Sequence, residues 1–350
     1  MAFPSKIFRV RVYLITVYLF GICLRPCYTQ DIQFSQVYSN LTYQNPAFAG
    51  SSQMHRFIFH NRYQWPRLDA RFYTTYFSYD CYLSKVKSGL GFLAYRDYQG
   101  GSKIVSNYFA GQYANEIHLS SSLSLRLGAQ LAYSSSTIDY SQFRYSQDFT
   151  SRGWGGNTYN QYGGDVFWYA DVSAGVLLYT EKLWFGVATN HINRPTQTFY
   201  DHIENRLPMK TSVTAGYRFV IKYIEPYRKF DKPIVYAIIP TAHYKMQGKS
   251  DQLDLGVYAQ LDRLLLGGWY RGIPFKNYSR YVYNNESLVL MAGLKYNDVA
   301  FAYSYDFTVS KLVRAGSGGA HELNITIYLN RERGHKKPHR FRTPCPDFFE

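Results

Sequence analysis

Short stretches that alternate apolar and polar side chains recur along this chain from residue 53 to residue 330. In HELNITIYLN (321–330) every second residue from Leu323 to Leu329 is apolar, and SLSLRLGAQLAY (122–133) alternates in the same way. Successive side chains of a strand point to opposite faces, so each stretch has one apolar face and one polar face. About a dozen such stretches of roughly ten residues are typical of a transmembrane β-barrel.

The spacing of these stretches predicts fourteen strands, at 53–65, 69–83, 87–98, 103–118, 120–136, 166–180, 182–193, 210–223, 232–246, 252–261, 262–273, 286–296, 298–309 and 320–330. If the first strand begins in the periplasm, long connections such as 137–165, 194–209 and 274–285 fall on the outer side. Most inner connections are short, which is the pattern of outer-membrane barrels. The predicted fold is therefore all-β: a transmembrane outer-membrane β-barrel of about 14 antiparallel strands.

The composition agrees with a membrane barrel. The chain has 36 Tyr and 24 Phe, and aromatic residues reach 19%. Aromatic girdles at the two membrane interfaces explain this excess, and the alternative is a Tyr-rich soluble sandwich or lectin. The 39 basic residues outnumber the 24 acidic ones. Because no stripe of Arg and base-stacking aromatics marks a nucleic-acid surface, we expect contact with anionic lipid headgroups or an acidic partner instead.

Residues 1–29 are predicted to be a secretory signal peptide that is removed. A basic segment (6–11) precedes an apolar run (12–24), and small residues at positions 27 and 29 suit a cleavage site. The apolar run is too short to span a membrane, and no later segment supplies some twenty apolar residues. We therefore expect the chain to reside in the outer membrane. Cleavage leaves Cys81 and Cys345, which do not form a disulfide framework, and whether they pair stays open.

Two flanks lie outside the predicted barrel (53–330). Residues 30–52 form a periplasmic or lumenal N-terminal segment, and residues 331–350 form a basic periplasmic tail. An even number of strands places both flanks on the periplasmic side.

No catalytic, cofactor or metal site is predicted, and we do not expect an enzyme. The glycines of 152–165 lack the Gly-Lys-Ser/Thr of a phosphate loop. His335 and His339 have no carboxylate or cysteine at metal-ligand spacing, and no G-x-S-x-G elbow occurs. Inward-facing acids of the strands are interpreted as polar lumen groups rather than catalysts: Asp171, Asp254 and Asp306, paired with Arg126, Arg218 or Lys295.

The segment 30–50 carries two motifs, Gln33-Phe34-Ser35-Gln36 and Asn45-Pro46-Ala47-Phe48-Ala49-Gly50. It resembles the start of the mature chains of the type IX secretion system membrane proteins of the PorP/SprF family. FHNRYQWP (59–66) and the Cys-Pro ending at 344–348 also resemble that family.

This resemblance implies an outer-membrane barrel of Bacteroidetes-type bacteria that supports type IX export, and often surface attachment, of cargo such as gliding adhesins. It also implies contacts with periplasmic and outer-membrane components of that system. A general diffusion porin, which needs an open lumen, is the alternative, and an outer-membrane enzyme is a third possibility.

Two groups of residues are the candidate functional sites. The first comprises Gln33, Phe34, Ser35, Gln36, Asn45, Pro46, Ala47, Phe48 and Gly50, which form either a plug or cap of the barrel or an ordinary lead-in to the first strand. The second comprises Lys336, Lys337, Arg340 and Arg342 of the tail, which either dock a periplasmic partner or anchor the tail to lipid headgroups.

Overall fold

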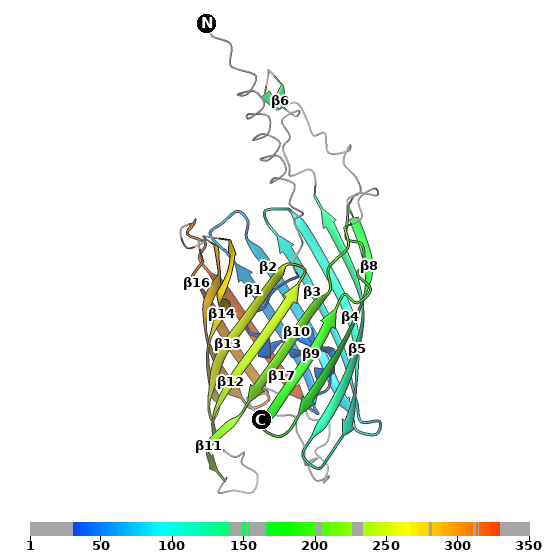
Figure 1. Ribbon diagram of the computed structural model, residues 1–350, viewed down its shortest axis with the longest axis vertical. Helices are drawn as coiled ribbons and strands as arrows, with labels where there is room; N and C mark the ends of the chain where they lie inside the picture. The colour runs from blue at the N-terminus through cyan, green and yellow to red at the C-terminus, as the bar shows by residue number, and fades with distance from the viewer. Residues whose placement is uncertain are drawn as a thin grey trace, which may run out of the picture. The chain divides into compact units, whose positions relative to one another are not determined.

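The computed structural model describes residues 31–139, 149–150, 153–154, 166–199, 205–225, 234–279, 282–310, 313 and 315–329. Fourteen antiparallel strands form one closed barrel (Figure 1). The barrel closes because the first strand, β1, pairs with the last, β17, and because β10 pairs with both β9 and β12. The predicted fold class is confirmed.

The barrel strands follow the chain in order and pair with their sequence neighbours. They are β1 (His55–Gln64), β2 (Phe72–Leu83), β3 (Ser88–Gln99), β4 (Ile104–His118), β5 (Ser124–Ile138), β8 (Val166–Tyr179), β9 (Leu183–Asn190), β10 (Lys210–Tyr217) with its continuation β11 (Phe219–Ile224), β12 (Ile234–Gln247), β13 (Ser250–Leu261), β14 (Leu264–Ser279), β15 (Val282–Tyr296), β16 (Val299–Thr308) and β17 (Ala320–Leu329). Between β5 and β8, the short strands β6 (Phe149–Thr150) and β7 (Gly153–Trp154) pair only with each other.

The strand positions agree with the sequence prediction, with three corrections. Most of the predicted loop 274–285 belongs to β14 and β15, whose pairing is irregular beyond Arg271. The predicted loop 247–251 is a two-residue turn at Gly248, whose φ of 59° suits glycine. The predicted strand 210–223 is interrupted at Arg218, whose backbone N–H donates to the carbonyl of Lys182, and beyond it β11 pairs only with β12.

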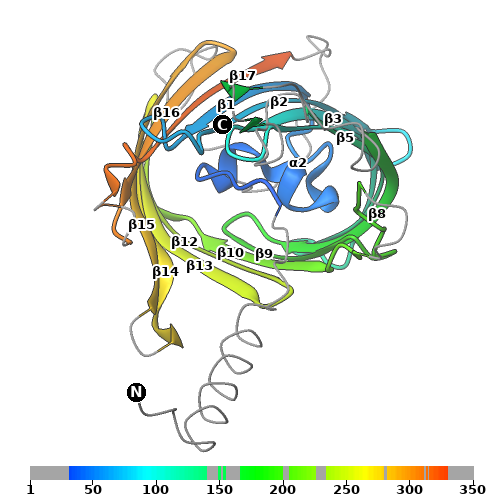
Figure 2. The ribbon, with the colours of Figure 1, turned by 90° about the horizontal axis from the view of Figure 1, so that it is seen from above.

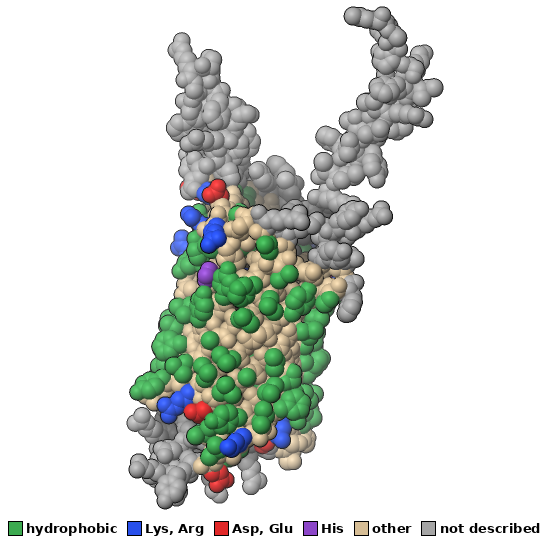
Figure 3. Space-filling view, turned by 90° about the vertical axis from the view of Figure 1, so that its left-hand side faces the viewer, with side chains coloured by type: hydrophobic (Ala, Val, Ile, Leu, Met, Phe, Trp, Pro, Cys, Tyr) green, Lys and Arg blue, Asp and Glu red, His purple; other side chains and the backbone are tan. Residues whose placement is uncertain are grey.

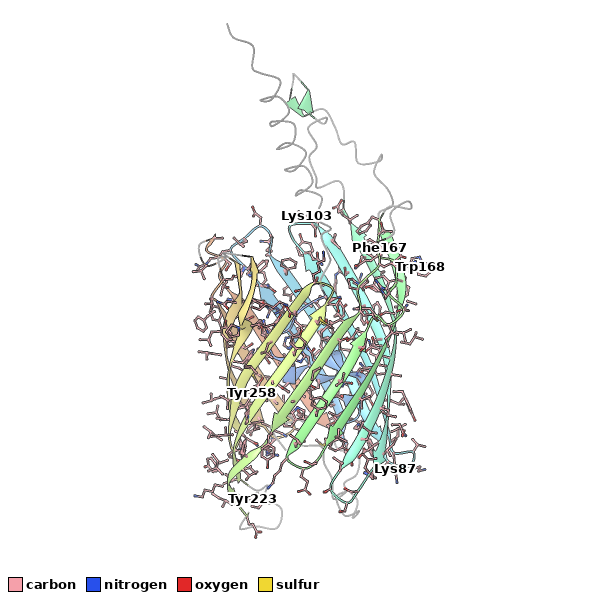
Figure 4. All side chains as sticks on the ribbon, viewed as in Figure 1. Lys87, Lys103, Phe167, Trp168, Tyr223 and Tyr258 are labelled. Carbon is pink, nitrogen blue, oxygen red and sulfur yellow. The ribbon has the colours of Figure 1, made fainter. Side chains whose placement is uncertain are left out.

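The two ends of the barrel differ in the length of their connections. One end, here the long-loop end, carries the connections 65–71, 100–103, 139–165, 191–209 and 309–319, together with the tight turn at 248–249 and the short connection between β14 and β15. The other, the short-loop end, carries 84–87, 119–123, 180–182, 225–233, 262–263 and 297–298. Lys103 and Trp168 mark the long-loop end in Figure 4, and Lys87 and Tyr223 mark the short-loop end.

The outer wall is apolar along the middle of the strands. On β5, Leu131 is 66% exposed, whereas its neighbours Gln130 and Ala132 are 6% and 5% exposed. Figure 3 shows hydrophobic side chains spread over the wall, with charged side chains gathered towards its two ends. This pattern fits an apolar membrane belt. The described residues contain no helix of the length and apolarity needed to cross a membrane.

The inner face combines charged and apolar side chains. Arg56, Arg126 and Arg271 are fully or almost fully buried in it, and so are Leu177 and Trp184. Large apolar side chains at full burial indicate contact with other protein atoms rather than with a water-filled channel.

Candidate functional site: the lumenal segment

Residues 32–53, here the lumenal segment, lie inside the barrel (Figure 2). Three short helical turns shape the segment: η1 (Val37–Ser39), α2 (Leu41–Gln44) and η2 (Pro46–Phe48). Every residue from 34 to 52 except Ser39 is buried. Turns this short satisfy few backbone groups, so the barrel wall must supply many of the remaining hydrogen bonds.

The segment runs from the long-loop end towards the short-loop end. The Gln33 side chain donates a hydrogen bond of 3.1 Å to Glu286, near the long-loop start of β15. The Gly50 N–H donates a hydrogen bond of 2.7 Å to Asp80, near the short-loop end of β2. The chain then turns into β1. The sequence did not predict this direction, because the strand count places the N-terminal flank on the periplasmic side.

The first motif is held by a buried carboxylate of β17. The backbone N–H groups of Ser35 and Gln36 donate to the two oxygens of Glu322, at 2.6 and 2.8 Å. The Gln36 side chain also donates to Ser304 and to the carbonyl of residue 322. Because ionised acceptors make the stronger hydrogen bonds, Glu322 is the principal anchor of this motif.

The Ser35 hydroxyl lies at the centre of a charged cluster drawn from three strands. It donates to Asp306 of β16 at 2.5 Å and accepts from Arg62 of β1 and Arg271 of β14, at 2.7 and 2.9 Å. Arg62 also pairs with Glu322, and Arg271 pairs with Asp254 at 3.1 Å. This arrangement joins β1 to β13, β14, β16 and β17 across the closing seam of the barrel.

The second motif is held by groups on the opposite side of the lumen. The side-chain Oδ1 of Asn45 accepts from the Ala47 N–H at 2.8 Å and caps η2, and Pro46 occupies the first turn. The Asn45 amide donates to carbonyls of Val176 and Val187, on β8 and β9. Asn45 therefore fixes both the local turn and its position on the wall.

Arg126 of β5 binds the backbone of the second motif. Its Nε donates to the carbonyl of Ala47 at 2.9 Å, and a terminal nitrogen donates to the carbonyl of Ala49. The other terminal nitrogen of Arg126 pairs with the carboxylate of Glu116 on β4 at 3.0 Å. Each charged group therefore has partners, which a buried ion needs.

Glycines of the wall make room for the second motif. A Cβ atom at Gly128 would lie 2.2 Å from the Ala47 nitrogen, one at Gly89 would lie 1.9 Å from the Ala49 oxygen, and one at Gly175 would lie 2.0 Å from the Asn45 oxygen. No other residue fits at these distances without moving the segment. The small side chains of Ala47 and Ala49 thus pack directly against a wall that lacks side chains.

Aromatic contacts fill the remaining interior. The Phe34 ring lies edge-on to the rings of Tyr43 and Tyr76, with centroids 5.1 and 5.5 Å away. Tyr38 contacts Trp184 and Tyr258 in the same way, at 6.0 and 5.7 Å. The lumenal segment and the inner wall therefore share apolar cores.

Comparison with known protein families decides the assignment. Residues 27–327 match the family described as the type IX secretion system membrane protein PorP/SprF. The chain belongs to this family. It is therefore an outer-membrane barrel of the type IX secretion system. No curated protein matches it.

Solved structures similar to this PorP/SprF barrel are distant outer-membrane proteins. A mutant of the Rh. blastica porin is 9% identical with a TM-score of 0.33, over 79% of this chain and 99% of the porin. A Pseudomonas aeruginosa FadL homologue is 12% identical with a TM-score of 0.34, over 78% and 89%. A deletion mutant of the TodX monoaromatic hydrocarbon channel is 9% identical with a TM-score of 0.39, over 85% and 94%.

The structure brings both motifs of this PorP/SprF protein together in the lumen, but it corrects the predicted ion pairs. The three acids face inward with other partners: Asp171 contacts His191 and Tyr108, Asp254 contacts Arg271, and Asp306 contacts Arg62 and Arg271. The three bases assigned to them also differ: Arg126 pairs with Glu116, Arg218 donates to Gln260, and Lys295 lies over the ring of Tyr328. Lumenal neighbours depend on strand register, which the sequence does not specify.

Sequence reasoning missed the residues that bind the two motifs, notably Arg62, Asp80, Arg271 and Glu322. The sequence feature that could have identified them is a charged residue at an inward-facing position of an alternating strand. Charges there need partners, because ions buried without partners are costly. The predicted docking residues Lys336, Lys337, Arg340 and Arg342 lie outside the described residues, as does Cys345. Cys81 is buried and free.

Proposed function

We propose that this PorP/SprF barrel is a plugged adaptor that supports export or surface attachment of cargo, including gliding adhesins, and contacts periplasmic secretion machinery. The observation that supports it most is the lumenal segment, which is buried from residue 34 to residue 52 except at Ser39. A diffusion porin needs an open lumen. An adaptor needs a rigid barrel whose two ends are accessible to partner proteins on the two sides of the membrane.

The proposed orientation places the long-loop end outside the cell. Its longest connections, 139–165 and 191–209, match the longer extracellular loops of outer-membrane barrels. We expect a Ser102→Cys variant to react with a membrane-impermeant maleimide on whole cells. The matched Ser84→Cys variant, at the short-loop end, should react only after the outer membrane is opened. The reverse pattern would invert the orientation.

The tail is the proposed contact with periplasmic components. Strand β17 ends at the short-loop end of the barrel, and the sequence after it contains Lys336, Lys337, Arg340 and Arg342. The positive charge of these four residues suits an acidic partner surface. Deleting 334–350 should leave a folded, heat-modifiable barrel while co-purification of type IX components and cargo display are lost. Reversing the charges of these four residues should cause the same losses as the deletion. With the intact tail, co-purification of the type IX components should weaken as the salt concentration rises.

The outcomes of this experiment separate the interpretations of the tail. Normal cargo display without the tail would favour the lipid-anchor interpretation. Failure of the truncated chain to insert would assign the tail to assembly instead. Mass spectrometry of proteins co-purified with the full-length chain tests the adaptor role itself, and recovery of no secretion component would contradict it.

A further inference from the structure

On strands β1 to β5, Arg96 breaks the rule that charged side chains point inward. Among the described strand residues whose side chains point outward on β1 to β5, it is the sole Lys, Arg, Asp or Glu. The other charged residues of these strands are buried inside: Arg56, Arg62, Asp80, Asp97, Glu116 and Arg126. An outward Arg is costly at the membrane midplane and is tolerated near the interfaces, so its depth on the wall decides whether its position is favourable.

Arg96 belongs to a continuous row of polar side chains. Its cross-strand partners are Thr75 on β2 and Asn107 on β4. Asn61 lies opposite Thr75, and Ser135 lies opposite Asn107. We call these five residues the outer polar row. Five polar residues at one register level, next to a wall that is apolar along the middle of the strands, indicate a polar contact outside the barrel.

The neighbouring rows on the wall show the character of this position. Towards the short-loop end the next outward residues are apolar or aromatic: Phe59, Phe77, Ala94, Phe109 and Tyr133. Towards the long-loop end, the next outward residues on β1, β2 and β3 are all tyrosines: Tyr63, Tyr73 and Tyr98. Tyrosines collect at the membrane–water interface, where the ring is buried and the hydroxyl is wet.

The depth of the row agrees with that interface. Each member lies three residues from the long-loop end of its strand. With a rise of about 3.3 Å per residue and a tilt of about 40°, the row lies about 8 Å below the strand ends. The 15-residue strand β4 is then about 38 Å tall and exceeds an apolar belt of about 25 Å by about 6 Å at each end. The row therefore lies at the edge of the belt, at headgroup level.

The described part of the chain supplies no partner for the charge. Neither the side chain of Arg96 nor that of Asn107 forms a hydrogen bond or ion pair with another described residue. Asn61, by contrast, accepts hydrogen bonds from Tyr73 and Thr75, at 3.1 and 3.0 Å. A planar guanidinium fork with the unpaired amide of Asn107 beside it suits the oxygens of a phosphate.

We propose that the outer polar row binds the anionic, phosphate-bearing headgroup of a membrane lipid in the leaflet at the long-loop end. The Arg96 fork donates to two phosphate oxygens, and the Asn107 amide donates a hydrogen bond to the same headgroup. The lipid thereby neutralises the one outward charge of β1 to β5 and fixes the depth of this side of the barrel. This site is independent of the proposed adaptor role.

Native mass spectrometry of the detergent-extracted, folded protein tests the proposal. Phosphatidylglycerol is titrated as the anionic probe and phosphatidylcholine as the zwitterionic control. Arg96→Gln should weaken phosphatidylglycerol binding about tenfold, because a hydrogen bond to a charged group contributes about 1.4 kcal/mol or more. Arg96→Lys keeps the charge without the fork and should fall between Arg96→Gln and the native protein. Phosphatidylcholine binding should not change.

Two further variants make the result specific. Arg263→Gln removes a cation at the short-loop end whose side chain is 68% exposed, and it should leave phosphatidylglycerol binding unchanged. Asn107→Ala keeps Arg96 and should weaken binding by a smaller factor. Equal binding by Arg96→Gln and the native protein would overturn the proposal. So would a photo-crosslinker at position 107 that captures a protein rather than lipid in native membranes.

Discussion

Replacing Gly128 with alanine should destabilise the barrel by about 1–3 kcal/mol or more, although the change adds only one methyl group. The added Cβ would lie 2.2 Å from the Ala47 nitrogen and 2.5 Å from its Cα, both backbone atoms that cannot rotate away. Either the lumenal segment or strand β5 must therefore shift, and the hydrogen bonds of Arg126 to the carbonyls of Ala47 and Ala49 shift with it.

Gly111 of β4 provides the matched control. A Cβ atom there meets nothing within 4 Å, since it points outward. Gly111→Ala should be neutral, or stabilising by up to about 1 kcal/mol, because alanine has less backbone freedom to lose in a strand. The measurement is the urea concentration at which half of each variant is unfolded in lipid vesicles. Loss of the heat-modifiable band on a gel reports the unfolding. Equal midpoints for the two variants would show that the segment does not pack against β5.

Replacing Arg62 with methionine should cost about 3–5 kcal/mol of folding stability. Its guanidinium pairs with Asp306 at 3.1 Å and with Glu322, and both carboxylates stay buried when it is removed. The same change removes a hydrogen bond to the Ser35 hydroxyl, so the first motif should loosen as well. Arg62→Lys should recover only part of the loss, because a point charge cannot replace the fork.

The control and the second variant concern the same charges. Arg263→Met removes an exposed cation and should change stability by no more than about 0.5 kcal/mol. Adding Glu322→Gln to Arg62→Met should restore stability relative to the single variant, because it removes one uncompensated charge. An Arg62→Met barrel as stable as the native one would show that the cluster is not buried in the membrane-embedded protein.

The sequence predicted the strands well because two-residue alternation is a local property. Leu323 to Leu329 alternate with polar residues whatever the rest of the chain does, and the lipid enforces that pattern. The prediction failed at 274–285, where polar residues such as Lys276 and Asn284 suggested a loop. Strands that rise beyond the membrane belt are not required to alternate, so the local signal ends before the strand does.

The lumen could not be predicted in the same way, because its contacts join distant parts of the chain. Ser35 and its anchor Glu322 are 287 positions apart, and which inward residues meet depends on the register of every strand between them. One local signal was available. In LLLGGW (264–269) the inward residues Leu265 and Trp269 are apolar like the outward ones, which indicates a strand buried on both faces. That pattern predicts a filled lumen at this strand.

Planar-bilayer recording on the native, folded protein tests most directly whether the lumen is plugged. With the lumenal segment in place, the account predicts no steady conductance. Gly128→Leu, which displaces the segment from β5 if the barrel still inserts, should produce stable channels or frequent openings. Stable, ohmic channels from the native protein, with the same conductance as those of the variant, would contradict the plug and favour the porin.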